Sequence, residues 1–138
     1  IPKTSWSYTM AKNMRTVIED GLRQLISAFN DDPYFKLAQI SFSKNFEHFV
    51  DRMLERKIDV ADVLTLMKKS VKNHKCEIVY FCHLEDAPLR LNLKNQDLVI
   101  GFTLHVDDNG IKRLRLRTIV ENFATRFDSR ISTFVIME

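Results

Sequence analysis

Residues 98–121 read LVIGFTLHVDDNGIKRLRLRTIVE, and this segment is the strongest indication of a β-sheet in the chain. Apolar and polar side chains alternate on both sides of Asp107-Asp108-Asn109-Gly110, as they do in two strands joined by a tight hairpin. The Asn-Gly pair favours a type I′ turn, because both residues tolerate a positive φ. We therefore predict strands at 98–106 and 111–121, and the same period predicts others at 76–84, 89–94 and 130–137.

The sequence before residue 76 has a helical period instead. It predicts helices over about 9–30, 43–57 and 59–73, with Asp59 as the N-cap of the third and Pro33 just beyond the end of the first. Helices first and strands afterwards indicate an α+β fold. We expect one domain over residues 1–138, with about three N-terminal helices packed on a mostly antiparallel sheet of four to five strands.

The composition narrows the possible classes of protein. Hydrophobic residues make up 45% of 138, which is typical of one globular domain. No apolar run approaches the ~20 residues that span a bilayer, and no secretory leader is visible, so we expect a cytoplasmic protein without membrane contact. Three glycines are too few for a Gly-rich phosphate loop. Cys76 and Cys82 are expected to be free thiols. The spacing of the cysteines and histidines predicts no metal site, and we expect no cofactor.

The net charge of +3 is unevenly distributed over the predicted sheet. If the leucines of each strand pack against the helices, the opposite face carries the basic side chains. These are Arg90, Lys94, His105, Arg113, Arg115 and Arg117. Arginine forks bind phosphates, and side chains ~7 Å apart along a strand suit successive nucleotides. The alternative is an ordinary solvated strand face.

A second constellation lies on the second predicted helix. His48 and Arg52 are four residues apart, so they share one face of the helix, and Arg56 follows one turn later. An imidazole can move protons near neutral pH, and a fixed guanidinium can stabilise the charge that develops on a phosphate. The alternative is a surface pair, for which Asp51 and Glu55 are simple ion-pair partners.

Three further residues are candidates for a supporting role. Lys68 could bind phosphate or act as a base, and His74 lies near the end of the same predicted helix. Cations at a helix C-terminus also complement its dipole, which is the structural alternative for both. Glu19, on the first helix, could orient a histidine or an arginine across a helix contact.

The segment from Phe46 to Asp59 resembles the RegB-type endoribonucleases of T-even-like bacteriophages. The similarity rests on His-x-x-Asp-Arg at 48–52 and on Arg-x-Ile-Asp at 56–59. Downstream, residues 90–93 and the Gly-Phe-Thr at 101–103 are similar to that family's hairpin. The first helix also aligns, with Arg15, Glu19, Arg23 and Gln24 in similar order, so the likeness is collinear over most of the chain.

The resemblance implies a RelE-like fold and a metal-independent nuclease that cuts single-stranded messenger RNA early in infection, leaving a 2′,3′-cyclic phosphate. It implies a ribosomal protein as stimulating partner and the host cytoplasm as location. His48 would be the catalytic histidine, Arg52 the phosphate ligand and Glu19 a supporting residue. The family's second histidine corresponds to Lys68, so Lys68, His74 or His105 is expected to supply the second proton-transfer group.

Two other functions are compatible with the same residues. One is a non-catalytic module that binds RNA or the ribosome through the basic face. The other is a structural phage protein or a protein-binding inhibitor that uses this face for docking. Steep salt dependence would indicate phosphate binding, and cleavage in EDTA would indicate the nuclease.

Overall fold

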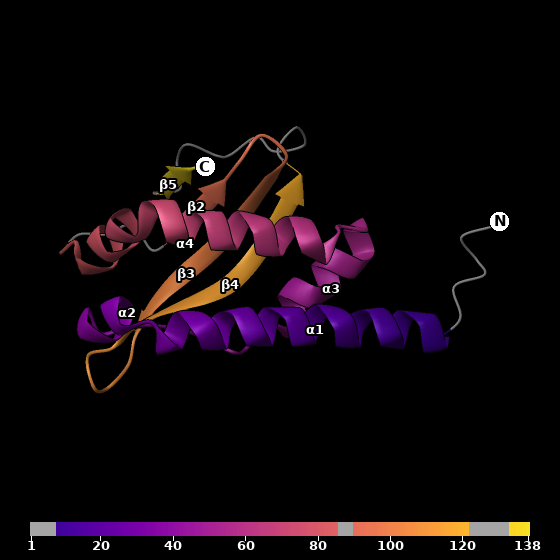
Figure 1. Ribbon diagram of the computed structural model, residues 1–138, viewed down its shortest axis with the longest axis horizontal. Coiled ribbons are helices and arrows are strands. Elements are labelled where there is room, and N and C mark those ends of the chain that lie inside the picture. Colours follow the sequence, from indigo (N-terminus) through magenta and orange to yellow (C-terminus); the bar gives the residue numbers. More distant parts are fainter. Residues whose placement is uncertain (1–7, 86–89, 122–132) are drawn as a thin grey trace.

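The computed structural model describes residues 8–85, 90–121 and 133–138 (Figure 1). The described chain forms α1 (Tyr8–Asp31), α2 (Pro33–Leu37), β1 (Ile40–Phe42), α3 (Glu47–Arg56), α4 (Val60–His83), β2 (Arg90–Lys94), β3 (Leu98–Val106), β4 (Lys112–Glu121) and β5 (Thr133–Met137). The predicted α+β class, with helices packed on a five-stranded sheet, is confirmed.

The sheet has the strand order β1-β4-β3-β2-β5 and is mixed. Antiparallel pairing joins β2 to β3 and β3 to β4, whereas the outer strands β1 and β5 pair in parallel with β4 and β2. The three residues of β1 are too few to show an alternating period, so the sequence did not predict this strand. The five-residue α2, which begins at Pro33, was missed for the same reason.

The predicted strand at 76–84 is wrong, because α4 continues to His83. Ile78, Phe81 and Cys82 are all buried, and their spacing of three and four residues is helical. His74 has non-helical backbone angles (φ −130°, ψ 27°), and this kink separates the two parts of α4. The break in the pattern near residue 75 therefore marks a kink rather than a change to strand.

Most of the remaining predicted boundaries hold closely, but α3 begins at Glu47, four residues after the predicted start at 43. Asp59 caps α4 by accepting a hydrogen bond from the Ala61 N–H, and β3 spans the predicted residues. β2, β4 and β5 begin at Arg90, Lys112 and Thr133; residue 89 and residues 130–132 lie outside the described chain.

The hairpin turn differs from the predicted type I′. Gly110 has φ +80°, but Asn109 does not have a positive φ. The Gly110 N–H donates to the Asp107 carbonyl, and Asp107 Oδ1 accepts from the N–H groups of Asn109 and Ile111. An aspartate at the first position stabilises a turn in which a single left-handed residue suffices.

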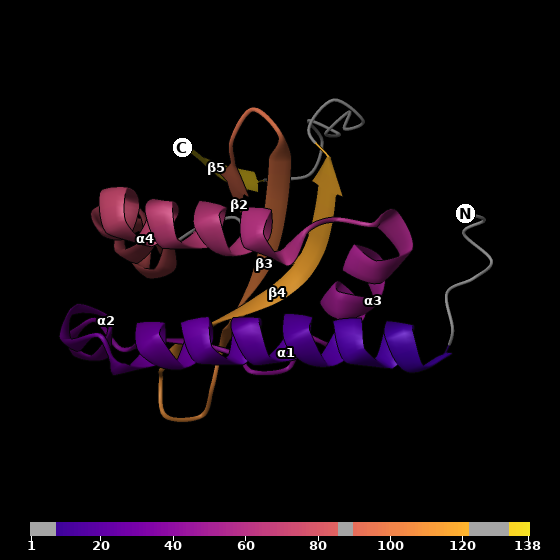
Figure 2. The same ribbon diagram turned by 45° about the vertical axis from the view of Figure 1, so that its right-hand side comes forward.

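The two faces of the sheet differ in how deeply their side chains are buried. Leu91, Leu93, Ile100, Leu114 and Leu116 are buried in the core shared with the helices. In Figures 1 and 2, α1 and α4 lie in front of β3 and β4, and α3 lies at one end of this layer. Because side chains alternate along a strand, Arg90, Arg113 and Arg115 belong to the opposite face.

A bulge interrupts this alternation in β4. Gly101 pairs with Thr118 and Phe102 pairs with Leu116, so Arg117 is the additional residue. A Cβ at Gly101 would collide with Thr118 Oγ1 and lie 3.1 Å from Asn92 Oδ1. The glycine therefore permits the close packing of Thr118 beside Arg117.

Candidate functional site: a cationic cavity between α3 and the sheet

A cavity of about 250 Å³ lies between α3 and the strands β2 and β4. His48, Arg52 and the preceding Asn45 and Phe46 line it from the α3 side. The sheet contributes Arg90, Arg115, Leu116, Arg117 and Thr118. Four arginines and one histidine thus meet in one hollow, from segments that are far apart in the sequence.

The core packing of α3 fixes His48 and Arg52 at this hollow. Phe49, Val50 and Met53 are fully buried, so the opposite side of the helix faces outward. Arg56 Nη1 donates a hydrogen bond to the Ile119 carbonyl and ties the end of α3 to β4. Arg56 does not line the cavity, and its described contact is structural.

Strand register brings the sheet arginines together. Thr103 pairs with Arg90 on one side and with Arg115 on the other, so the two arginines lie on one row across β2, β3 and β4. Arg115 is half-buried, and its Nε atom is buried without a hydrogen-bond partner among the described residues. A buried donor in this state costs free energy until an acceptor reaches it.

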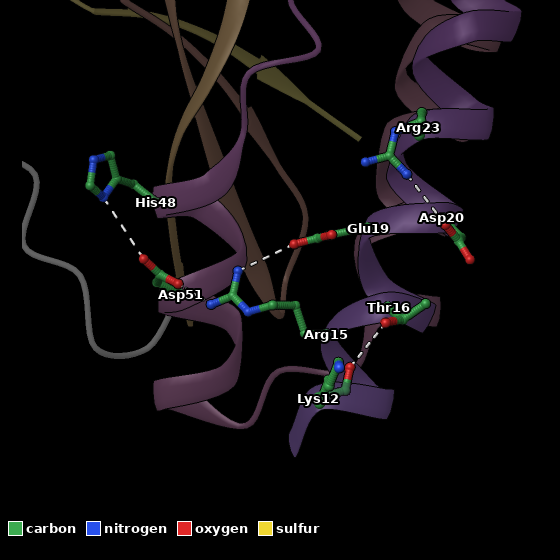
Figure 3. A network of polar contacts seen from close by, with 8 residues as sticks. All are labelled: Lys12, Arg15, Thr16, Glu19, Asp20, Arg23, His48 and Asp51. Atoms are coloured by element: carbon green, nitrogen blue, oxygen red, sulfur yellow. Dashed lines mark hydrogen bonds and ion pairs between the residues drawn. The ribbon is translucent and has the colours of Figure 1, made fainter. Parts of the chain in front are cut away.

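A chain of charged groups links His48 to α1 (Figure 3). His48 Nδ1 lies 3.9 Å from Asp51 Oδ2. Asp51 Oδ1 accepts a hydrogen bond from Arg15 Nη2, and Arg15 Nη1 lies 3.3 Å from Glu19 Oε1. The hydrogen bond from Arg15 to Asp51 is the main cause that raises the pKa of Arg15 above its ordinary value. Glu19 therefore contacts an arginine of its own helix, and Arg15 rather than Glu19 makes the contact across to α3.

Lys68 does not join this site. It is exposed on α4, whose buried residues pack in the same core as Leu91 and Leu93. Lys68 is not among the residues that line the cavity. The structure thus brings His48 and Arg52 together at the cavity, but Lys68 is not part of it.

His74 is also remote from the cavity, at the kink of α4. Its Nδ1 lies 2.8 Å from Glu77 Oε1, and its Nε2 lies 2.8 Å from Glu138 Oε2. The hydrogen bond to Glu77 is the largest cause that raises the pKa of His74, ahead of the contact with Glu138. Its described contacts join α4 to the C-terminal residue after β5.

The predicted basic face is divided into separate groups. Arg113 Nε lies 3.1 Å from Asp107 Oδ2, and His105 pairs with Arg113 near the hairpin turn. Lys94 lies at the other end of β2. None of these three lines the cavity, which takes only Arg90, Arg115 and Arg117 from the predicted face.

The sequence indicated some of the remaining site residues and not others. The four-residue spacing of Arg15 and Glu19 is visible in the sequence, but the contact of Arg15 with Asp51 depends on how α1 packs against α3. Asn45 and Thr118 carry no signal, because a single amide or hydroxyl is common in loops and strands.

Other kinds of site find little support in the described residues. Cys76 and Cys82 are free, as predicted, and burial raises the pKa of Cys82 to about 12. Residues 8–85, 90–121 and 133–138 contain no group of three or more acidic, histidine or cysteine side chains placed to hold a metal. In the same ranges no helix combines the length and apolar character of a membrane span.

The fold and the cavity define an α+β protein with a cationic cavity built from guanidinium groups and one imidazole. No curated protein and no solved structure matches the chain. The sequence profile of the T4-phage endoribonuclease RegB matches residues 5–137, nearly the whole chain. The chain therefore belongs to the RegB endoribonuclease family.

Proposed function

We propose that this chain is a metal-independent endoribonuclease that cuts single-stranded messenger RNA by transesterification. One observation carries the proposal: His48 and Arg52 of α3 share a cavity with Arg90, Arg115 and Arg117 of the sheet. A proton-transfer group beside several fixed cations is what cleavage of a phosphodiester by its own 2′-hydroxyl needs.

His48 acts as the general base in this reaction. It takes the proton of the 2′-hydroxyl, and the 2′ oxygen forms a bond to the adjacent phosphorus. The bond from phosphorus to the 5′ oxygen breaks, and the 5′ oxygen keeps the electron pair and takes a proton from solvent. A 2′,3′-cyclic phosphate and a 5′-hydroxyl result. His48 is 86% exposed, so water reaches the reacting atoms.

Arg52 and Arg115 stabilise the negative charge on the phosphate oxygens. The unpaired Arg115 Nε supports this role, because a phosphate oxygen would supply the missing acceptor. Arg90 and Arg117 extend the positive surface along the RNA backbone. Solvent supplies the second proton transfer, because Lys68 does not line the cavity.

Membership of the family supports the wider assignment. We propose that the reaction takes place in the cytoplasm of the phage's host, on host or early phage transcripts, with the ribosome or a ribosomal protein as partner. The proposal predicts that RNA incubated with the chain in EDTA acquires 5′-hydroxyl and 2′,3′-cyclic phosphate ends. A substrate with a 2′-deoxy nucleotide at the cleaved position should bind and remain intact.

A second function is favoured by the small number of proton-transfer groups. His48 is the one histidine that lines the cavity, whereas efficient acid–base catalysis uses two groups. A non-catalytic RNA-binding module would keep the arginines and show steep salt dependence without new RNA ends. Binding without cleavage in the EDTA experiment would select this function.

A further inference from the structure

The Asp51 carboxylate lies beside the candidate base and outside the cavity. His48 lines the cavity, and Asp51 does not. Within the described residues, Asp51 is the one charged or hydrogen-bonding partner of the His48 ring, at 3.9 Å from Nδ1 (Figure 3). This distance exceeds a hydrogen bond, but a ring that is 86% exposed can rotate and close the gap.

Asp51 itself is held from the neighbouring helix. Arg15 of α1 donates to Asp51 Oδ1, which leaves Oδ2 on the side of His48. Glu19, one turn further along α1, holds the second terminal nitrogen of Arg15 at 3.3 Å. The Asp51 carboxylate, which belongs to α3, is therefore held in place by Arg15 of α1, although it is 44% exposed. The guanidinium also offsets negative charge that would repel RNA.

We propose that Asp51 is a positioning residue for His48, held by Arg15 and Glu19. The carboxylate accepts a hydrogen bond from Nδ1–H, so the neutral ring carries its lone pair on Nε2. The hydrogen bond made by one ring nitrogen decides which nitrogen keeps the proton. The Nε2 lone pair then serves as the base. This inference rests on the proposed function, in which His48 accepts the 2′-hydroxyl proton.

The competing explanation is that the ion pair between Arg15 and Asp51 only clamps α1 to α3. A clamp would change stability and would leave the protonation of His48 alone. Glu47 offers a matched control, since it is an exposed carboxylate next to His48 in the sequence and contacts no described basic group. The decisive readout is thus the ring tautomer of His48, which does not depend on any activity.

The tautomer can be measured by ¹⁵N NMR of the histidine ring nitrogens in the full chain. The chain has four histidines, and the signal absent from His48→Gln identifies His48. At a pH where the ring is neutral, we expect mainly the Nδ1–H form in the wild type. Asp51→Ala and Arg15→Met should shift the signal toward the Nε2–H form that imidazoles favour in water, and Glu47→Ala should not.

Cleavage provides the second arm of the experiment. Asp51→Ala should lower kcat about 5-fold, the effect of one exposed charge pair, with RNA affinity unchanged. An unaltered tautomer in both Asp51→Ala and Arg15→Met would overturn the positioning role, whatever happens to stability. Absence of cleavage by the wild type would instead overturn the proposed function, and the tautomer would still decide the role of Asp51.

Discussion

Replacement of Arg115 by methionine should weaken RNA binding without destabilising the protein. Methionine keeps an apolar stem of similar length and removes every donor of the guanidinium. In the wild type, the Nε donor is buried and has no partner among the described residues. An unsatisfied buried donor costs about 1–3 kcal/mol, so the variant should unfold at equal or higher denaturant concentration.

The loss on the RNA side can be estimated from the same contact. A hydrogen bond to a charged group contributes about 1.5–3 kcal/mol, which corresponds to a 10- to 150-fold weaker complex. Loss of one phosphate contact should also lower the slope of log K against log salt by about 0.7 for a single strand. Fluorescence anisotropy with a labelled RNA at several salt concentrations measures both quantities.

Arg113 provides the matched control on the same strand. It lies two residues from Arg115, is paired with Asp107 at 3.1 Å and does not line the cavity. Arg113→Met should change affinity by less than about 3-fold, because its exposed pair contributes little. Equal affinity loss in both variants would refute the cavity as the binding site. Destabilisation of Arg115→Met by more than about 1 kcal/mol would show that its side chain already has a structural role.

The structure supports three further predictions. The pKa of His74 is raised in the folded protein, so its contacts with Glu77 and Glu138 stabilise the fold below about pH 6.5, and this contribution is lost as pH rises through the higher folded pKa. The fall in Tm across this pH range should therefore be smaller in His74→Gln than in the wild type. Parallel curves of Tm against pH for the two proteins would contradict this prediction. Gly101→Ala should destabilise the fold by about 1–3 kcal/mol in chemical denaturation, because the new Cβ collides with Thr118, and an unchanged midpoint would count against the bulge geometry. Lys68→Ala should keep cleavage within about 2-fold of the wild type, since deletion of a proton-transfer group would instead cost ~100-fold or more in single-turnover rate.

The elements with the longest periodic patterns were predictable from the sequence. β3 and β4 were found because alternation continues over nine or more residues around a clear turn. The segment at 76–84 was misassigned because a kinked helix interrupts its own period, and the short run around Ile78 fits either period. The turn type was also wrong, since Asp107 stabilises a geometry that uses only one left-handed residue.

The site was partly predictable for a similar reason. The four-residue spacing of His48 and Arg52 is a property of one helix, and it survives in the structure. Which sheet arginines meet them depends on strand register and on the docking of α3 against β4, and neither is encoded in local spacing. Arg113 and Arg115 look equivalent in the sequence, yet only Arg115 reaches the cavity.

The role of His48 as the base is tested most directly by comparing His48→Ala with His105→Ala in single-turnover cleavage of RNA. Both residues are exposed histidines, but only His48 lines the cavity. If His48 is the base, His48→Ala should lose about 100-fold or more in rate while it still binds RNA, and His105→Ala should cleave normally. Equal rates in the two variants, with 2′,3′-cyclic phosphate ends formed by both, would contradict it.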